Sequence, residues 1–172
     1  MKVLIVSDIH GNFINMKKVI QNDSSFDKLL ILGDILSGPS REGYDPKQLA
    51  LFLNLFKDKI ISVNGNCDFS NELLEFSNKH SFLTIPIDDK IFFMTHGHIY
   101  NFRRLPDLDY DVFLQGHTHV PVMDVVDGKI YLNPGSITLP RGNSKKSYIL
   151  YDNGEFQLKD LEENKILKRI KS

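Results

Sequence analysis

The stretch VLIVSDIH, residues 3–10, decides how the rest of the chain is interpreted. Residues 3–6 form an unbroken apolar run, which is typical of a β-strand covered on both faces. Asp8 and His10 follow at the carboxyl end of that strand. After residues 11–12, apolar side chains recur at helical spacing from Phe13 to Ile20, so the first unit is predicted to be strand, loop and helix.

The same arrangement recurs twice in the next part of the chain. The apolar run at residues 29–32 ends in Gly33-Asp34, and the run at residues 60–63 is followed by polar residues 64–68. Between them, Asp45-Pro46 predicts the capped start of a second helix. Ligands of open α/β sheets gather at the carboxyl ends of strands, so these polar groups are expected to share one site.

The second half of the chain is predicted to be mostly β. Asp127-Gly128 and Asn153-Gly154 each lie between short apolar runs, which indicates hairpin turns of the type I′ class. Further strands are expected at residues 82–87, 91–94 and 112–114. We also expect a helix over residues 72–76 and a loosely held tail from residue 162, helical or frayed.

Composition limits the classes of protein that need to be considered. With 172 residues, 41% of them hydrophobic and 25% charged, the chain is expected to form one globular domain spanning residues 1–172. Its 21 basic and 22 acidic residues give a formal net charge of -1, so there is no global basic field for nucleic acid. The single cysteine, Cys67, and the lack of a membrane-length apolar run predict a cytoplasmic protein without membrane contact.

Seven groups of metal-ligand type follow predicted strands or lie in His-x-His and Asp-x-His pairs. Taken singly, each has an ordinary structural explanation such as a turn or a cap. As a set of carboxylate, imidazole and amide groups they suit Mn²⁺, Fe²⁺, Zn²⁺ or Ni²⁺, and they exceed what one ion needs. A closed structural zinc site is disfavoured because the chain has one cysteine. The seven groups belong to Asp8, His10, Asp34, Asn66, His96, His117 and His119.

Two ions that share a carboxylate would account for the set. Such a pair, about 3.5 to 4 Å apart, can hold a hydroxide for in-line attack on a phosphoryl group. The predicted reaction class is therefore phosphoester hydrolysis.

Five short motifs in order resemble those of the calcineurin-like metallophosphoesterases, and most closely the small bacterial and archaeal phosphodiesterases of the YfcE type. Any one of them is weak evidence, but their order is specific, and the resemblance runs from residue 1 to about residue 151. The motifs are Asp8-Ile9-His10, Gly33-Asp34, Gly65-Asn66-Cys67-Asp68, Thr95-His96-Gly97-His98 and Gly116-His117-Thr118-His119.

The resemblance implies a four-layer α/β/β/α sandwich with two metals at the strand ends. By that resemblance Asp8, His10 and His119 hold one ion, Asp34 bridges, and Asn66, His96 and His117 hold the other. Mn²⁺ is the first expectation, with Zn²⁺, Fe²⁺ or Ni²⁺ as alternatives. The reaction centre would comprise Asp34, Asn66, Cys67 and Asp68.

Cys67 departs from the family pattern, because many members have histidine there. A thiol with a pKa near ~8.5 is a poorer proton donor than imidazolium, so aryl phosphodiesters are expected to be preferred over phosphomonoesters. Asp68 is expected either to orient neighbouring groups or to cap a helix. No role is assigned to His98.

Two other functions share this fold or chemistry. A protein-binding scaffold is opposed by the intact ligand set, and a nuclease would need a basic channel. The six candidate cations for such a channel are Lys145, Lys146, Lys165, Lys168, Arg169 and Lys171. A small phosphoester is the expected substrate, and a homo-oligomer is left open. The sequence does not rank the candidates for phosphate contact, which are Arg41, Arg103, Arg104 and Arg141.

Overall fold

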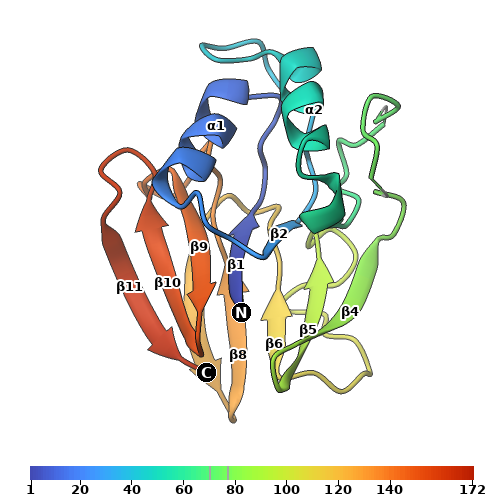
Figure 1. Ribbon diagram of the computed structural model, residues 1–172. Coiled ribbons are helices and arrows are strands. Elements are labelled where there is room, and N and C mark those ends of the chain that lie inside the picture. Colours follow the sequence, from blue (N-terminus) through green and yellow to red (C-terminus); the bar gives the residue numbers. More distant parts are fainter. Residues whose placement is uncertain (70, 77) are drawn as a thin grey trace.

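The computed structural model describes residues 1–69, 71–76 and 78–172, and its framework is two β-sheets packed face to face (Figure 1). The first sheet has the strand order β11-β10-β9-β1-β2-β3. Its strands are β1 (Lys2–Val6), β2 (Lys28–Ile31), β3 (Ile60–Ser62), β9 (Ser147–Asp152), β10 (Glu155–Asp160) and β11 (Ile166–Lys171).

The second sheet has the order β4-β5-β6-β8-β7. In the first sheet, β1, β2 and β3 are parallel and form one half, whereas β9, β10 and β11 are antiparallel and form the other. The second sheet has a parallel centre, β5-β6-β8, with the antiparallel strands β4 and β7 at its two edges. The strands of the second sheet are β4 (Phe82–Ile87), β5 (Lys90–Thr95), β6 (Val112–Leu114), β7 (Val122–Val126) and β8 (Lys129–Asn133).

Two helices, α1 (Phe13–Asn22) and α2 (Pro46–Asn54), cover the outer face of the first sheet (Figure 1). Each begins where the sequence predicts, since the side chains of Asn12 and Asp45 accept hydrogen bonds from the backbone N–H groups of the first turns. A short 3₁₀ turn, η1 (Lys57–Lys59), follows α2. No helix of the described residues is long and apolar enough to cross a membrane.

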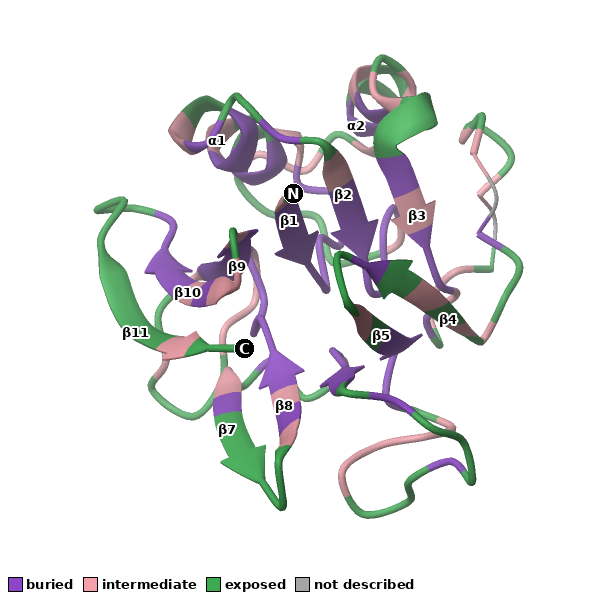
Figure 2. Ribbon diagram, turned by 60° about the horizontal axis from the view of Figure 1, so that its bottom comes forward, coloured by how far each residue is buried: buried purple, intermediate pink, exposed green. Residues whose placement is uncertain are grey.

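Alternate side chains of each strand enter different cores, as a period of two requires. Phe92 of β5 belongs to the core between the sheets, whereas its neighbour Phe93 faces the opposite side of the second sheet. The buried strands form the centre of the molecule, while β11 and the outer part of β7 are exposed (Figure 2). The two-sheet α/β architecture is confirmed.

The fourth layer differs from the expected helices. On the outer face of the second sheet, an aromatic cluster packs under the irregular segment of residues 96–111. Aromatic rings bury a large apolar area each, so a loop carrying several of them can cover a sheet without a helix. The aromatic cluster comprises Tyr100, Phe102, Tyr110, Phe113, Tyr131 and Phe93.

Two local predictions are wrong. Residues 72–76 form turns and bends instead of a helix, because Asn54 of α2 bonds Leu73 O and Glu75 N through its side chain and so replaces helical bonding. The tail is neither helical nor frayed, since residues 166–171 form β11, paired with β10 along its length. Asp160 starts the intervening turn by accepting the N–H groups of Glu162 and Glu163.

Candidate metal centre

The first group of candidate ligands comes from the loops after β1 and β6. The Nε2 atom of His119 lies 3.1 Å from Oδ1 of Asp8 and 3.4 Å from Nε2 of His10. His10 Nε2 is in turn 3.8 Å from Asp8 Oδ1 and 3.7 Å from Asp34 Oδ2. These residues, far apart in the sequence, therefore place one oxygen of each carboxylate and two ring nitrogens around a common point.

The second group lies on the other side of Asp34. His96 Nε2 is 3.5 Å from Asp34 Oδ2, 3.0 Å from Asn66 Oδ1 and 3.2 Å from His117 Nδ1. Asp34 Oδ2 thus faces a histidine of each group. Sets of ligand atoms within 4.8 Å of one another occur at Asp8-His10-His119 and at Asp8-Asp34-His96.

Backbone carbonyls fix the rings of three histidines. The Nδ1 atoms of His10, His96 and His119 lie 2.7, 2.6 and 2.7 Å from the carbonyl oxygens of Ser37, Leu32 and Leu139, respectively. Because a carbonyl only accepts, each Nδ1 carries the proton and each Nε2 presents a lone pair.

In the first group, the inward-facing atoms are therefore electron-rich and face no hydrogen-bond donor among the described residues. His10 and His119 point lone pairs at each other, and Asp8 Oδ1 is buried without a hydrogen-bond partner in the described chain. Unpaired buried carboxylate oxygen is expensive unless a cation satisfies it. The donor set, mixed oxygen and imidazole nitrogen without thiolate, fits divalent transition ions.

The pKa values of His119, Asp8 and His117 are shifted by burial and by the neighbouring ligands. Burial opposes a charge on His119, but Asp8 beside its Nε2 raises its pKa above the ordinary value, since a proton there would fill the gap between the two atoms. Burial also opposes ionised Asp8, yet His119, His96 and Ser7 lower its pKa overall. Burial, then the neighbouring His96, lowers the pKa of His117. Protons and metal ions therefore compete for the first group.

Five of the seven candidate ligands also share an uncommon backbone conformation. Their φ angles are left-handed, which costs about 1–2 kcal/mol for a residue with a side chain. Such strain persists only where the surrounding structure enforces it. The values are 53° at Asp8, 49° at His10, 53° at Asp34, 66° at His117 and 60° at His119.

The loop after β8, residues 133–139, ties the first group together. Ser136 Oγ donates to Asp8 O at 2.8 Å, and Asn133 Nδ2 donates to Gly116 O at 2.9 Å. Leu139 of the same loop supplies the carbonyl that orients His119. The residue types of this loop give no sign in the sequence of which groups it holds.

Asp68 contacts backbone amides, and no helix of the described residues begins at it. Its Oδ2 accepts the N–H groups of Asp34 and Gly65, and its Oδ1 accepts that of Ile35, each at 2.8 Å. It therefore fixes the loops after β2 and β3 against each other, in the orienting role that was one of its two expectations.

Cys67 lies beside the centre without facing it as a ligand. Its backbone N–H donates to Asp34 Oδ1 at 2.8 Å, and Asn66 Nδ2 lies 3.2 Å from its sulfur. Burial, followed by the negative charge of Asp34, raises the pKa of the thiol to about 11. The thiol is therefore protonated at neutral pH and is a weak donor.

A cavity of about 620 Å³ opens next to the second group. His117 and His98 line it, together with Phe102 and Arg103. His98, which has no assigned role, thus lines the cavity beside His117, and its ring centroid lies 5.4 Å from that of His96. Of the other arginines, Arg141 is close enough to His119 to oppose its protonation.

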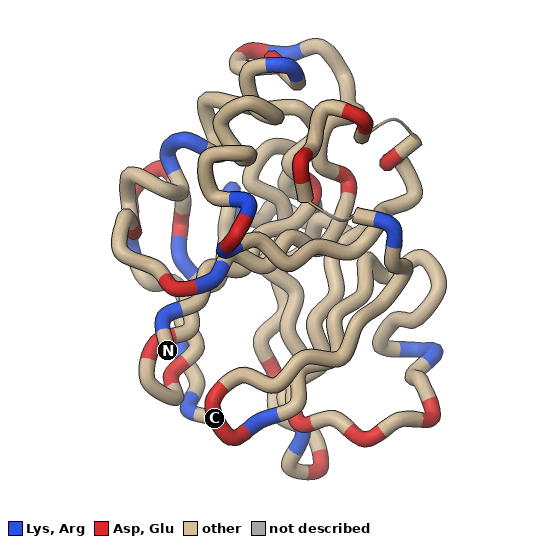
Figure 3. Tube along the Cα trace, turned by 45° about the vertical axis from the view of Figure 1, so that its right-hand side comes forward, with Lys and Arg blue, Asp and Glu red and all other residues tan. Residues whose placement is uncertain are grey.

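The cations near the C-terminus do not form a free basic patch. Positive and negative residues are intermixed along the chain (Figure 3), and five of the six candidate cations face a carboxylate. Pairing of this kind leaves little net field for a phosphate backbone. The pairs are Lys145–Asp160, Lys146–Glu162, Lys165–Glu163, Lys168–Asp124 and Arg169–Glu155.

Comparison with known proteins gives a consistent result over the whole fold. Residues 1–155 match the family described as Calcineurin-like phosphoesterase superfamily domain. Phosphodiesterase YfcE of Escherichia coli (strain K12) is 35% identical over 179 residues, which cover 99% of this chain and 97% of that protein. A phosphodiesterase of Methanocaldococcus jannaschii is 31% identical over 78% of this chain and 83% of its own length. The solved structure of the E. coli phosphoesterase YfcE matches with a TM-score of 0.92 and 33% identity over 99% of both chains.

Proposed function

The chain belongs to the calcineurin-like phosphoesterase superfamily and is a metal-dependent phosphodiesterase, and on this premise we propose that it uses two divalent metal ions. Asp8, His10 and His119 would hold one ion, and Asn66, His96 and His117 the other, with Asp34 shared. The observation that carries this assignment is the convergence of unpartnered lone pairs, above all the buried Asp8 Oδ1.

Bound ions of this kind would supply Lewis-acid polarisation of the phosphoryl oxygens and a water nucleophile of lowered pKa. The protein's own contribution is to hold the ligands in place. The carbonyls of Ser37, Leu32 and Leu139 keep three imidazoles in the required tautomer, and Asp68 fixes the loop that carries Asp34.

We further propose that Mn²⁺ occupies both sites, with Zn²⁺, Fe²⁺ or Ni²⁺ as alternatives. The proposal rests on the balance of ligands, since carboxylate and amide oxygens accompany the imidazoles and no thiolate is offered by the protonated Cys67.

Cys67 restricts the range of substrates. With its pKa raised to about 11, the thiol has little tendency to protonate a departing alkoxide. Substrates with good leaving groups should therefore react best, and we expect activated aryl phosphodiesters to be preferred over phosphomonoesters.

The test is a panel of diesters and monoesters assayed after the metal-free protein is loaded with Mn²⁺, Mg²⁺, Zn²⁺ or Ni²⁺. We expect diester hydrolysis to be highest with Mn²⁺. Lack of hydrolysis with every ion would favour the non-catalytic scaffold, and equal turnover of monoesters would contradict the role given to Cys67.

A single domain over residues 1–172 and a cytoplasmic location stay predictions. Whether the protein forms a homo-oligomer stays open. The core shared by the two sheets supports the single domain.

A further inference from the structure

The cavity beside His117 adjoins the candidate metal centre, because His117 belongs to both. Its volume of about 620 Å³ lies within the range of about 300–1,000 Å³ that is usual for small-molecule sites. A phosphodiester whose phosphoryl group lies among the metal ligands has two ester arms, and at least one of them must occupy space beyond the ligands.

Part of the lining of this cavity is apolar. It includes Phe102 and, at and after the loop that carries the two histidines, Val120 and Val122. The Phe102 ring is held by edge contacts to Tyr131 at 5.7 Å and a tilted contact to Phe113 at 5.6 Å between ring centroids. A ring fixed in this way can pack against a planar group with little loss of side-chain entropy.

The turn that carries Phe102 is rigidly built. Asn101 and Arg104 exchange backbone hydrogen bonds of 3.0 and 2.9 Å across it, and the buried Gln115 accepts the Phe102 N–H at 2.9 Å. Gln115 uses its carbonyl oxygen in this bond, and its amide nitrogen has no hydrogen-bond partner in the described part of the chain. That nitrogen is a donor available to an oxygen or ring nitrogen in the cavity, which Gln115 lines.

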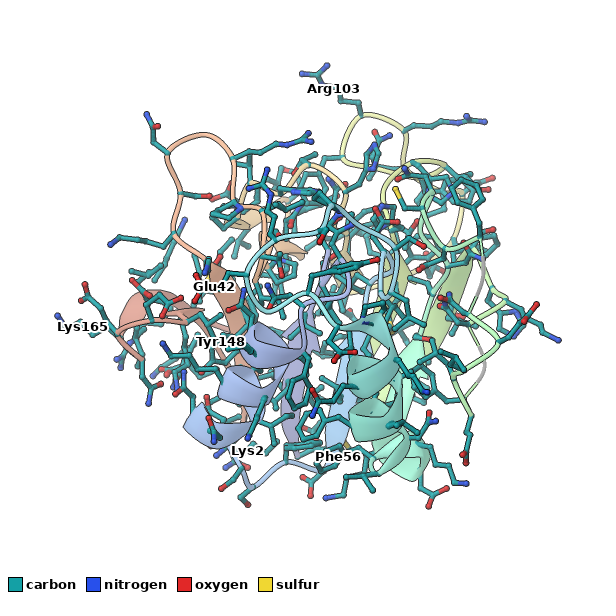
Figure 4. All side chains as sticks on the ribbon, turned by 90° about the horizontal axis from the view of Figure 1, so that it is seen from above. Lys2, Glu42, Phe56, Arg103, Tyr148 and Lys165 are labelled. Carbon is teal, nitrogen blue, oxygen red and sulfur yellow. The ribbon has the colours of Figure 1, made fainter. Side chains whose placement is uncertain are left out.

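The charge of the cavity suits an anionic ester. No Asp or Glu is among its lining residues, and Arg103 makes no ion pair with any described carboxylate. Arg103 points away from the body of the molecule (Figure 4), which places its charge at the outer rim. Of the six candidate cations near the C-terminus, by contrast, five face a carboxylate.

Building on the proposed function, we propose that this cavity binds the ester arm that stays on phosphorus, and that the preferred arm is a planar ring, aryl or nucleobase-like. In the reaction the oxygen of water bonds to phosphorus and the bond to the other arm breaks. That arm leaves and takes up a proton from the water, so the retained arm undergoes no change of charge. A cavity without a carboxylic acid suits such an arm, because nothing there has to protonate it.

The test compares two diesters with the same leaving group, bis(para-nitrophenyl) phosphate and methyl para-nitrophenyl phosphate, on the Mn²⁺-loaded protein. We expect a lower KM for the diester with the retained aryl arm. In Phe102→Ala this KM should rise about tenfold, while the values for the methyl ester change little. Leu108→Ala is the matched control, since Leu108 is an exposed apolar residue of the same segment that lines a different cavity.

A second variant guards against misfolding of Phe102→Ala. Val120→Phe narrows the cavity at another lining residue and should also raise the KM for the aryl diester alone. Calorimetry gives a readout without turnover: phenylphosphonate should bind more tightly than methylphosphonate, and the difference should shrink in both variants.

The outcomes separate the two proposals. Failure of the wild-type protein to hydrolyse either diester would count against the proposed function. Hydrolysis of both diesters with equal KM, or equal losses on both in Phe102→Ala and Val120→Phe, would overturn the assignment of the cavity alone.

Discussion

Left-handed backbone occurs in two regions that otherwise differ, the candidate metal centre and the hairpin turns. In the turns, Asp127 and Asn153 have φ angles of 50° and 47°, and each is followed by a left-handed glycine. Asp and Asn tolerate this conformation because their short side chains bond locally. At the centre, histidines adopt it as well, and tertiary hydrogen bonds such as His117 N–H to Asp8 Oδ2 at 3.0 Å hold them there.

The two regions also differ in the space around their glycines. A methyl group on Gly128 of the β7–β8 turn would meet no atom within 4 Å. On Gly116 it would lie 1.8 Å from Ser7 Oγ and 2.9 Å from Asp8 Oδ2. Local conformation alone therefore does not distinguish a turn from a site, whereas close approach of distant segments does.

The largest effect is expected from removing a carboxylate at the metal centre, compared with removing one from a hairpin turn. Asp34→Ala should reduce the rate of diester hydrolysis by more than about 100-fold, because Asp34 faces both groups of ligands. A loss of about 100-fold is the upper limit usual for residues that only hydrogen-bond to a metal ligand. Asp127→Ala removes a carboxylate with nearly the same φ from a turn and should leave hydrolysis unchanged. Rates of bis(para-nitrophenyl) phosphate hydrolysis with Mn²⁺ measure both, and equal activity of Asp34→Ala would rule out the mechanism.

The next largest effect concerns the two groups of ligands within the metal centre. His117→Ala and His119→Ala should each lose one of the two ions, because their rings belong to different groups. Asn153→Ala, altered at a left-handed turn residue, should keep both. Metal content per chain, measured by mass spectrometry after dialysis, checks this division, which loss of both ions from either histidine variant would contradict.

A smaller effect concerns stability. Gly116→Ala should lower the free energy of unfolding by about 1–3 kcal/mol through overpacking and weaken metal binding. Gly128→Ala should lower it by about 1–2 kcal/mol through its φ of 77° alone, with metal binding intact. Urea unfolding with and without Mn²⁺ separates the two, since only Gly116→Ala should show a reduced gain in stability from the ion.

The smallest effect is a shift with pH. The pKa of His119 is raised and that of His117 is lowered, so as pH falls a proton displaces metal from the first group before the second. The ion retained in His117→Ala should therefore dissociate at a higher pH than the ion retained in His119→Ala. Acid titrations of metal content in the two variants measure both midpoints, and the reverse order would show that the pKa directions do not govern binding.

Prediction from sequence succeeded where the signal is local. The strands at residues 3–6, 29–32 and 60–63, the capped helices and the hairpin at Asp127-Gly128 are encoded by short patterns of apolar and turn residues. It failed for β11, whose residues 166–171 show no alternation and depend on β10 for pairing. It failed at residues 72–76 because Asn54, distant in sequence, bonds that backbone.

By itself, the sequence determined which residues can act as ligands and the order of the strands that carry them. The tertiary structure alone decided how those ligands are aimed: which nitrogen each histidine presents, through the carbonyls of Ser37, Leu32 and Leu139, and that Asp8 Oδ1 is left without a partner. It also placed Arg103 at the rim of the cavity and Asp68 among backbone amides. The physical reason is that every residue has a carbonyl, so no pattern of side chains marks the few that meet an imidazole from a distant strand.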